Sequence, residues 1–333
     1  MSRRIGVLGA GSWGTALGMH LARRGHSACL WDISSEHVEA LRRDASNERY
    51  LPGIVFPPGL AAHSDLEWVC SHSDHLLLVT PSHAFVETLA KVRPWLTAQS
   101  GLAWATKGFE PGSARLLHEV AEEALGAEIP LALITGPSFA REVAEGLPTA
   151  VTVAASTPQF GAAWAEWLHG DNFRAYYTAD LPGAELGGAL KNVLAVACGI
   201  ADGLGLGGNT RAALITRGLA EMMRLGRALG ASPMTLTGLA GVGDLVLTCT
   251  GDLSRNRRLG LALAEGKSLD QAVAEIGQVV EAVRTTEEAM RLAARYQVEM
   301  PITEQVHGIL FEGWSARKGV QMLMQRELKP ETH

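Results

Sequence analysis

The chain has 333 residues, of which 47% are hydrophobic and 19% are charged, and its formal net charge is -6. This length and composition are typical of a globular protein that is large enough for two cores. The mild acidity disfavours nucleic acid or an anionic membrane as the main partner. No signal sequence precedes the first strand and no uncharged apolar run reaches membrane-spanning length, so we expect a soluble, cytoplasmic protein without membrane insertion.

Cysteine and histidine spacing argues against a metal site. The cysteines form no CxxC pair and fit reduced core thiols; they are Cys29, Cys70, Cys198 and Cys249. His72 and His75 are three residues apart, but no Cys or carboxylate ligand accompanies them at metal-site spacing. We therefore expect no metal and interpret four histidines as surface or loop residues, namely His63, His72, His75 and His83.

The first 32 residues predict a dinucleotide site. An apolar strand at residues 4–8 leads into a GxGxxG turn, a helix at residues 13–24 and a second strand at residues 27–31 that ends beside Asp32. Gly9 allows the tight turn, Gly11 lets the backbone approach a pyrophosphate, and Gly14 permits close packing of strand and helix. Phosphates would bind the N-terminal amides of the helix, and Asp32 would meet the adenosine ribose.

Strands and helices continue to alternate up to about residue 185. We predict helices at 35–44, 84–92, 113–125, 139–145 and 159–168, and strands at 75–80, 102–106, 131–135, 149–154 and 172–178. The strands are continuous apolar runs, which favours a mostly parallel sheet covered on both faces. The fold class is therefore α/β, with a Rossmann-like domain at residues 1–185 and an all-helical domain at residues 186–333. Residues 47–59, a long proline-bound loop, and the polar tail after Arg326 stay unassigned.

Ligands of open parallel sheets bind beyond the carboxyl ends of the strands. This chain places the glycine turn, residues 80–82, Lys107 and residues 135–138 at those ends. Simple turn chemistry accounts for residues 80–82. Lys107 is either directed at the ligand crevice or an exposed lysine at a strand end.

Residues 185–221 are predicted to form one buried hub. Leu186, Leu190 and Val193 recur at helical spacing, and small residues occupy the other faces. Lys191 and Asn192 interrupt this apolar helix. A buried, unpaired ammonium is costly, so Lys191 requires a cavity, a partner or a ligand unless its side chain reaches solvent at a helix end.

A second helix start offers a phosphate site. Ser254 is a good N-cap for a helix that continues to about Glu265, and Arg255 and Asn256 fall in its first turn. Backbone amides, a guanidinium and a side-chain amide can together bind one anion. Basic residues oppose the helix dipole at this end, which indicates an anionic partner. Arg257 and Arg258 are interpreted as a solvated basic patch.

The motifs together resemble the bacterial NAD(P)-dependent glycerol-3-phosphate dehydrogenases over almost the whole chain. The matching segments are GAGSWGTAL, WATKGFE, ITGPSFARE, LGGALKNV, GLAGVGDLVLTCT, SRNRRLG and GQVVEAVRT. The resemblance implies a Rossmann domain followed by a helical domain of the 6-phosphogluconate-dehydrogenase type, in a homodimer whose subunits share a long helix. It also implies an oxidoreductase acting on a CH–OH group, which interconverts sn-glycerol 3-phosphate and dihydroxyacetone phosphate and supplies phospholipid synthesis.

The resemblance also implies roles for individual residues. Lys191 matches the proton acceptor of the family, with Lys107 and Asp244 as its catalytic neighbours. The implied substrate site consists of Lys107, Gly136, Ser138, Lys191, Asn192, Asp244, Ser254, Arg255 and Asn256. The implied cofactor site consists of Gly9, Gly11, Ser12, Trp13, Gly14, Asp32, Lys107, Ala140, Arg255, Val279 and Glu281.

Two other functions are compatible with parts of the pattern. A 3-hydroxyacid or phosphogluconate dehydrogenase of the same architecture would also use a helix lysine, and only the SRNRR segment and Lys107 argue against it. A non-catalytic sensor of cofactor redox state would need an output module such as a basic helix-turn-helix, and the sequence contains no such segment.

Cofactor choice is where the chain departs from many relatives. Members that accept NADP often have glycine or alanine and then a basic residue after the tryptophan of the second strand, whereas this chain has Trp31 followed by Asp32, Ile33 and Ser34. No arginine or lysine follows before Arg42. A carboxylate repels a 2′-phosphate, so we expect NAD(H) to be preferred and NADP(H) to be used less well.

Overall fold

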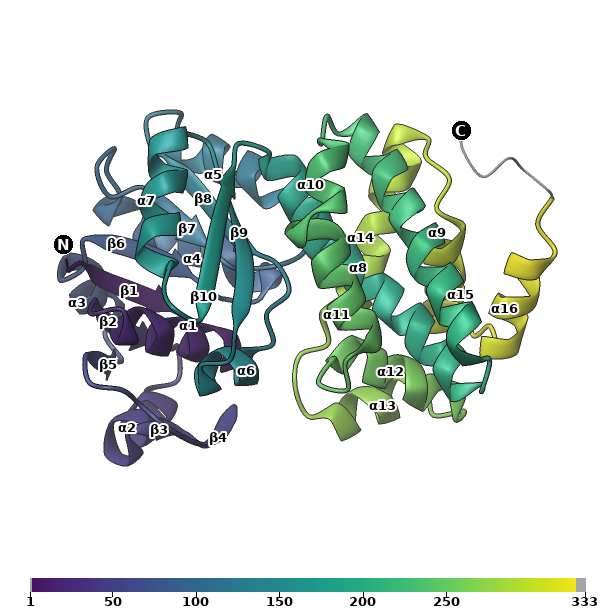
Figure 1. The fold of residues 1–333 in the computed structure, drawn as a ribbon, viewed down its shortest axis with the longest axis horizontal. Coiled ribbons are helices and arrows are strands. Elements are labelled where there is room, and N and C mark those ends of the chain that lie inside the picture. Colours follow the sequence, from purple (N-terminus) through teal and green to yellow (C-terminus); the bar gives the residue numbers. More distant parts are fainter. Residues whose placement is uncertain (1, 328–333) are drawn as a thin grey trace.

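The computed structural model describes residues 2–327 and places a mostly parallel sheet beside a group of helices (Figure 1). Within these residues the main sheet has eight strands in the order β10-β9-β8-β7-β6-β1-β2-β5. The strands are β1 (Arg4–Leu8), β2 (Ser27–Trp31), β5 (Leu60–His63), β6 (His75–Leu78), β7 (Leu102–Trp104), β8 (Leu131–Thr135), β9 (Thr149–Ala155) and β10 (Phe173–Thr178). The helices among them are α1 (Ser12–Arg23), α2 (Ser35–Asp44), α3 (Leu66–Ser71), α4 (Ser82–Val92), η1 (Arg93–Trp95), α5 (Leu117–Leu125), α6 (Ala140–Glu145) and α7 (Pro158–Leu168).

The strand order places a crevice at the end of β1. β1 pairs in parallel with β2 on one side and with β6 on the other, so the direction of chain progression reverses there. β6, β7 and β8 continue in parallel, and the antiparallel pair in this sheet is β8 with β9. The carboxyl ends of β1, β6, β7 and β8 therefore lie along one edge, at the position where such sheets bind ligands. The predicted α/β fold class is confirmed.

The segment left unassigned from the sequence contains structure. Residues of the 47–59 loop form a small antiparallel pair of β3 (Ser46–Asn47) and β4 (Leu51–Val55). The Asn47 side chain donates hydrogen bonds to the Ala10 carbonyl (2.9 Å) and to Thr15 Oγ1 (2.8 Å). These contacts tie the hairpin to the glycine turn. Strand β5 and helix α3 were also not predicted, because each is too short to show a clear hydrophobic period.

The interpretation of His75 as a surface or loop residue is wrong. Its side chain is 7% exposed within β6, and its Nδ1 lies 2.8 Å from the Ser100 carbonyl oxygen. Its ring packs against Trp167, with the ring centroids 4.3 Å apart. Burial lowers the pKa of His75, so the side chain belongs to the packed end of the sheet as a neutral ring.

Every described element after β10 is helical, as predicted. These elements are α8 (Leu181–Gly203), α9 (Gly207–Ala228), α10 (Pro233–Thr237), η2 (Leu239–Gly243), α11 (Asp244–Thr250), α12 (Arg255–Ala264), α13 (Leu269–Ile276), α14 (Glu281–Tyr296), α15 (Pro301–Phe311) and α16 (Ala316–Met324). The predicted domain boundary at residue 185 falls inside α8, and the division at that point stays a prediction. Of the tail that could not be assigned from the sequence, residues 328–333 lie outside the described part of the chain.

Helix α8 is the centre of the helical region, and it is buried over almost its whole length. It packs against α9, α11, α12 and α14, and each fully buried leucine on it contributes about 1.5–3 kcal/mol to stability. By length and composition α8 could cross a membrane, but all of its apolar window is covered by protein. The predicted hub is confirmed for α8 and wrong for residues 207–217, because much of the first half of α9 is exposed.

Candidate functional site

The glycine turn after β1 forms an open cradle at the start of α1. Gly9 has φ +117, and a Cβ there would lie 2.7 Å from the Val79 carbonyl oxygen. A Cβ at Gly14 would lie 1.9 Å from the Gly9 carbonyl oxygen, whereas a Cβ at Gly11 would meet nothing within 4 Å. Helix α1 begins at Ser12 with no side-chain cap and no acidic residue in its first turn. Uncapped amides beside open space fit the pyrophosphate of a dinucleotide.

Asp32 lies beside this cradle. Its Oδ2 accepts a hydrogen bond from the Ala10 amide (3.2 Å), and its Oδ1 accepts one from the Ser34 amide (3.0 Å). These bonds fix the carboxylate at the end of β2 while leaving each oxygen a further lone pair. The position fits the predicted contact with a ribose hydroxyl.

The other predicted cofactor residues come from several separate elements. Helix α6 starts at Ala140 and packs along α1. Val279 and Glu281 line a cavity of about 470 Å³ together with Pro81, from the loop that follows β6, and Ser82, the first residue of α4. The carboxyl edge of the sheet and the start of α14 therefore face one another across this cavity.

A buried group of three charges, which we call the charged centre, consists of Lys191 on α8, Lys107 from the loop after β7 and Asp244 at the start of α11. Lys191 is 6% exposed and Asp244 is 1% exposed. Lys107 Nζ donates to Asp244 Oδ2 (2.8 Å), and Lys191 Nζ donates to Asp244 Oδ1. When both lysines are protonated, two ammonium groups and one carboxylate leave an excess positive charge in a buried position. Such an excess is costly unless an anion binds nearby, so the charged centre fits an anionic ligand.

The three charges alter one another's pKa values. Burial lowers the pKa of Lys191 to about 7, with the positive charge of Lys107 acting in the same direction and Asp244 opposing it. Burial also acts to lower the pKa of Lys107, but the Asp244 carboxylate outweighs it and raises that pKa. Burial acts to raise the pKa of Asp244, but the two lysines outweigh it and hold that pKa low. Lys191 is therefore the group of the three that can exchange a proton near neutral pH.

Close backbone approaches bring the charged centre together. A Cβ at Gly187 would lie 2.2 Å from the Ala240 carbonyl oxygen, so α8 admits the π-helix η2 against its backbone at this point. Asp244 follows η2 directly as the first residue of α11. A Cβ at Gly188 would lie 3.0 Å from Thr135 Oγ1, which places the end of β8 on the same turn of α8. Gly187 therefore lets the LGGALKNV and GLAGVGD segments, which are distant in the sequence, come into direct contact.

The loop after β8 reaches the same region. Ser138 Oγ donates to the Gly136 carbonyl (3.0 Å). A Cβ at Gly243 would lie 3.4 Å from the Pro137 side chain, which places this loop against the residue that precedes Asp244. Gly136 and Ser138 are therefore near the charged centre, as the predicted substrate site requires.

The turn that we predict to bind a phosphate lies at the start of α12. Ser254 Oγ accepts from the Arg257 amide (3.2 Å), which confirms the predicted N-cap. The Asn256 side chain is directed inward, where it donates to Asn192 Oδ1 (2.8 Å) and accepts from the Ala282 amide (3.1 Å). Asn192 in turn donates to Glu281 Oε2 (3.1 Å). The side chains of Asn192 and Asn256 thus join α8, α12 and α14 between the charged centre and the cavity at Glu281.

Two features of the site were missed or misread from the sequence. Thr248 Oγ1 donates to the Asp244 carbonyl (2.6 Å) and lies 3.4 Å from Asp244 Oδ1, and its i,i+4 spacing from Asp244 on α11 is the signal that could have identified it. The interpretation of Arg257 as part of a solvated patch is wrong, because its side chain is 12% exposed and pairs with Asp202 (2.7 Å).

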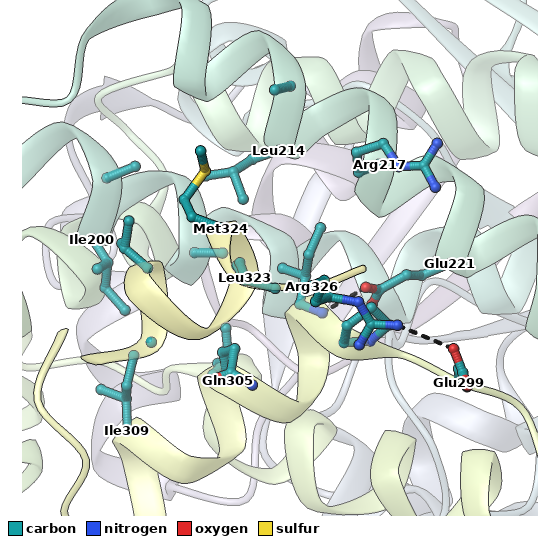
Figure 2. A pocket seen from close by; sticks show the side chains of 18 of the residues that line it. Ile200, Leu214, Arg217, Glu221, Glu299, Gln305, Ile309, Leu323, Met324 and Arg326 are labelled. Atoms are coloured by element: carbon teal, nitrogen blue, oxygen red, sulfur yellow. Dashed lines mark hydrogen bonds and ion pairs between the residues drawn. The ribbon is translucent and has the colours of Figure 1, made fainter. Parts of the chain in front are cut away.

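A cavity larger than the one at Glu281 lies elsewhere. It has a volume of about 770 Å³ and lies between α9, α15, α16 and the later turns of α8. Figure 2 shows its apolar walls, which include Ile200, Leu214 and Ile309, with Gln305 among them. None of the residues of the charged centre lines it. Size therefore does not identify the reactive site here, and the position of the titratable groups does.

Comparison with known proteins places the chain in a family. Residues 4–161 match the family model described as the N-terminus of NAD-dependent glycerol-3-phosphate dehydrogenase, and residues 180–321 match the model of its C-terminus. The chain belongs to the NAD-dependent glycerol-3-phosphate dehydrogenase family. The fold and the resemblance predicted from the sequence are therefore confirmed.

Individual relatives agree over nearly the full length. The glycerol-3-phosphate dehydrogenase [NAD(P)+] of Stenotrophomonas maltophilia is 58% identical over 328 residues, which cover 98% of this chain and 96% of the relative. The crystal structure of glycerol-3-phosphate dehydrogenase from Coxiella burnetii is 49% identical, with a TM-score of 0.94 over 98% of this chain and 99% of that chain. The Saccharomyces cerevisiae enzyme is 26% identical, with a TM-score of 0.84 over 98% of this chain and 100% of that chain.

Proposed function

We propose that this protein is a glycerol-3-phosphate dehydrogenase that interconverts sn-glycerol 3-phosphate and dihydroxyacetone phosphate with NAD(P). The observation that supports this reaction most strongly is the charged centre, in which a lysine with a pKa of about 7 stands beside a second, charged lysine and a buried carboxylate. A phosphorylated alcohol supplies both the anion and the removable proton that this arrangement suits. The full-length similarity to enzymes named for this reaction supports the same conclusion.

Lys191 is the proton acceptor in this proposal. As a neutral amine it takes the proton of the C2 hydroxyl as the C–H bond at C2 breaks, and in the reverse direction its ammonium form returns that proton to the carbonyl oxygen. Asp244 stays ionised and holds both lysines by hydrogen bonds. Lys107 keeps its positive charge near the substrate oxygen, where negative charge develops.

The cofactor, when bound, supplies the hydride acceptor on its nicotinamide ring. The chain's own part is to bind and orient it. The turn at Gly9, Gly11 and Gly14 would hold the pyrophosphate on the first amides of α1, with Ser12 and Trp13 beside it. Asp32 would accept from the adenosine ribose, so we propose that NAD(H) is preferred over NADP(H).

The substrate phosphate would bind at the first turn of α12. The backbone amides of this turn and the Arg255 guanidinium are the donors, and Ser254 fixes the turn as its N-cap. Arg255 Nη1 lies 3.5 Å from Gln278 Oε1, a long contact that a phosphate can replace with shorter, charge-assisted bonds. This turn is the feature that separates the proposal from a dehydrogenase for an unphosphorylated hydroxyacid.

Three further proposals follow from the family membership. The protein acts as a homodimer, it works in the cytoplasm, and its product in the reductive direction supplies phospholipid synthesis. The two-domain division near residue 185 is proposed in the same way. Size-exclusion chromatography with light scattering tests the first of these, because a monomer at micromolar concentration would exclude a stable dimer.

A single assay tests the reaction. Purified protein is incubated with NADH or NADPH and dihydroxyacetone phosphate, and the cofactor's absorbance is followed. In the oxidative direction glycerol 3-phosphate is compared with glycerol, 3-hydroxybutyrate and 6-phosphogluconate. We expect turnover with glycerol 3-phosphate and at most trace turnover with the other three. Comparable kcat/KM for glycerol, or higher kcat/KM for either acid, would contradict the proposal.

A further inference from the structure

Two adjacent arginines at the start of α12 have opposite surroundings. The Arg257 side chain is 12% exposed and makes ion pairs, whereas Arg258 is exposed. Arg258 makes no hydrogen bond or ion pair with any residue between positions 2 and 327. Of these two adjacent arginines, only Arg257 therefore makes contacts that stabilise the arrangement of the helices.

Arg257 binds the C-terminal end of α8 through one carboxylate, that of Asp202. Its Nε and Nη2 both donate to Asp202 Oδ2, at 2.9 and 2.7 Å. The other Asp202 oxygen accepts from Arg211 on α9 (2.9 Å), so this carboxylate joins α8, α9 and α12. The contact of Arg257 with Asp252 adds little, because the Asp252 side chain is 97% exposed.

The crossing of α8 and α12 is formed by two glycines, one on each helix. A Cβ at Gly199 would lie 2.1 Å from the Arg257 carbonyl oxygen, and a Cβ at Gly260 would lie 2.2 Å from the Val196 carbonyl oxygen. The two backbones are thus in direct contact over a smooth surface. Two side-chain contacts join the N-terminal end of α12 to α8: the hydrogen bond from Asn256 to Asn192 (2.8 Å) and the fork of Arg257 on Asp202, which is the charge-assisted one of the two.

Arg257 is also part of the capped turn itself. Its backbone amide donates to Ser254 Oγ (3.2 Å), so its side chain and its main chain hold the same turn from two directions. Arg255 and Asn256 lie between these two attachment points. A shift of this turn moves Arg255 and the first amides of α12 relative to Lys191.

We propose that Arg257, through its fork on Asp202, is the positioning residue that sets the substrate-phosphate site of α12 at its working distance from the charged centre. This inference rests on the proposed function, because it concerns the phosphate of that substrate. Arg257 itself touches neither substrate nor cofactor, since its donors are engaged with Asp202 and Asp252. It determines the affinity of the site for a phosphate monoester by placing other donors.

The test compares Arg257→Ala with Arg258→Ala, which removes the same charge from the neighbouring position. We expect Arg257→Ala to raise the KM for dihydroxyacetone phosphate about tenfold or more, the size that follows from losing one charge-assisted contact at the phosphate. The KM for NADH should rise by a smaller factor, because Arg255 is shared with the cofactor but the glycine turn before α1 is unchanged. Arg258→Ala should leave both values within about twofold of the wild type.

Two further measurements separate positioning from a general loss of structure. Inorganic phosphate, used as a competitive inhibitor against dihydroxyacetone phosphate, should lose affinity in Arg257→Ala by about the same factor as the substrate. Arg257→Lys restores the charge without the fork and should recover only part of the KM. If Arg257→Ala does not fold, Asp202→Asn removes the carboxylate that Arg257 binds and leaves the sequence of α12 unchanged, and Arg211 loses its contact with that carboxylate as well.

Equal effects of Arg257→Ala and Arg258→Ala would overturn the inference. Equal loss of affinity for NADH and for dihydroxyacetone phosphate would also overturn it, since that outcome marks a global defect. The proposed function is tested separately, on the wild type alone. If the wild type does not turn over glycerol 3-phosphate, the proposed reaction is wrong, and the contact between Arg257 and Asp202 has only a structural role.

Discussion

The cofactor cradle and the charged centre are built in different ways. The cradle consists of backbone from one contiguous segment. Gly11 leaves open space for a ligand, and Gly9 and Gly14 allow close contacts with neighbouring backbone. The charged centre consists of side chains from β7's end, α8 and α11, and two of its members, Lys107 and Asp244, are 137 positions apart. A backbone site tolerates changes of side chain around it, whereas a site made of three mutually dependent charges changes as a whole when one is removed.

The largest expected effect comes from Lys191→Ala, which should break the charged centre and leave the cradle intact. General acid–base catalysis contributes about 10²–10⁴-fold, so we expect a kcat loss within that range. NADH binding, measured by fluorescence titration, should change less than about twofold, since no part of the cradle is altered. Retention of more than about a tenth of the wild-type kcat, a loss below about 1.4 kcal/mol, would exclude Lys191 as the proton acceptor.

Arg255→Ala sharpens the comparison, because the family places this residue at both sites. Charge-assisted hydrogen bonds contribute about 1.5–3 kcal/mol, so the KM for glycerol 3-phosphate should rise about tenfold or more. Steady-state kinetics with each substrate varied in turn will separate the two roles. A larger increase in the KM for the cofactor than in the KM for glycerol 3-phosphate would assign Arg255 to the cofactor instead.

Asp32→Gly tests the cradle without touching the charged centre. The wild type should prefer NADH to NADPH by about tenfold or more in kcat/KM, because the carboxylate repels a 2′-phosphate. The variant should lose most of that preference while its KM for dihydroxyacetone phosphate stays near the wild-type value. A wild type that uses NADPH as well as NADH, or an unchanged ratio in the variant, would show that Asp32 does not face the ribose.

The two regions also differ in how far the sequence predicts them. The GxGxxG turn and its strand and helix are local, so their spacing alone predicts the cradle, and the structure has the turn in that form. Lys191 stood out as a charge in an apolar helix, but its pairing with Asp244 depends on η2 packing against Gly187, a contact between distant segments. The same reason explains Arg257, whose partner Asp202 lies 55 positions away. From the sequence alone, Arg257 and Arg258 are two adjacent arginines that cannot be told apart.

The smallest expected effect concerns Glu221, which belongs to neither region and lines the large cavity shown in Figure 2. Its carboxylate accepts from the Thr303 amide (3.2 Å) and hydroxyl (3.0 Å), so it caps α15. Burial raises its pKa to about 7 from an ordinary value of 4.5, although these hydrogen bonds act to lower it. The folded state therefore binds the proton more tightly than the unfolded state, and this contribution to stability is complete below about 4.5 and is lost as the pH rises through 7.

Glu221→Gln should remove this pH dependence without changing activity. Thermal unfolding of both proteins at pH 5 and pH 8 gives the midpoint of the variant relative to the wild type. We expect the unfolding midpoint of the variant, relative to that of the wild type, to be about a few degrees higher at pH 8 than at pH 5. A difference that stays constant, or that favours the wild type more at pH 8, would show that Glu221 is ionised throughout.

The central claim is that Lys191 exchanges the substrate proton with a pKa of about 7, and the pH dependence of glycerol 3-phosphate oxidation tests it most directly. Oxidation requires the neutral amine, so kcat/KM should rise about tenfold per pH unit below that pKa and level off above it. The substrate phosphate titrates near pH 6 as well, by the ordinary value for such groups. Lys107→Met distinguishes titration of Lys191 from titration of the substrate phosphate. Removing a positive charge beside Lys191 raises the pKa of Lys191 and leaves the pKa of the phosphate unchanged. We expect the kcat/KM profile of the wild type to level off near pH 7 and that of Lys107→Met to level off at a higher pH. A profile that levels off only near the ordinary lysine pKa of about 10.4, or a profile that the substitution does not shift, would contradict the role of Lys191 as proton acceptor with a pKa near neutral.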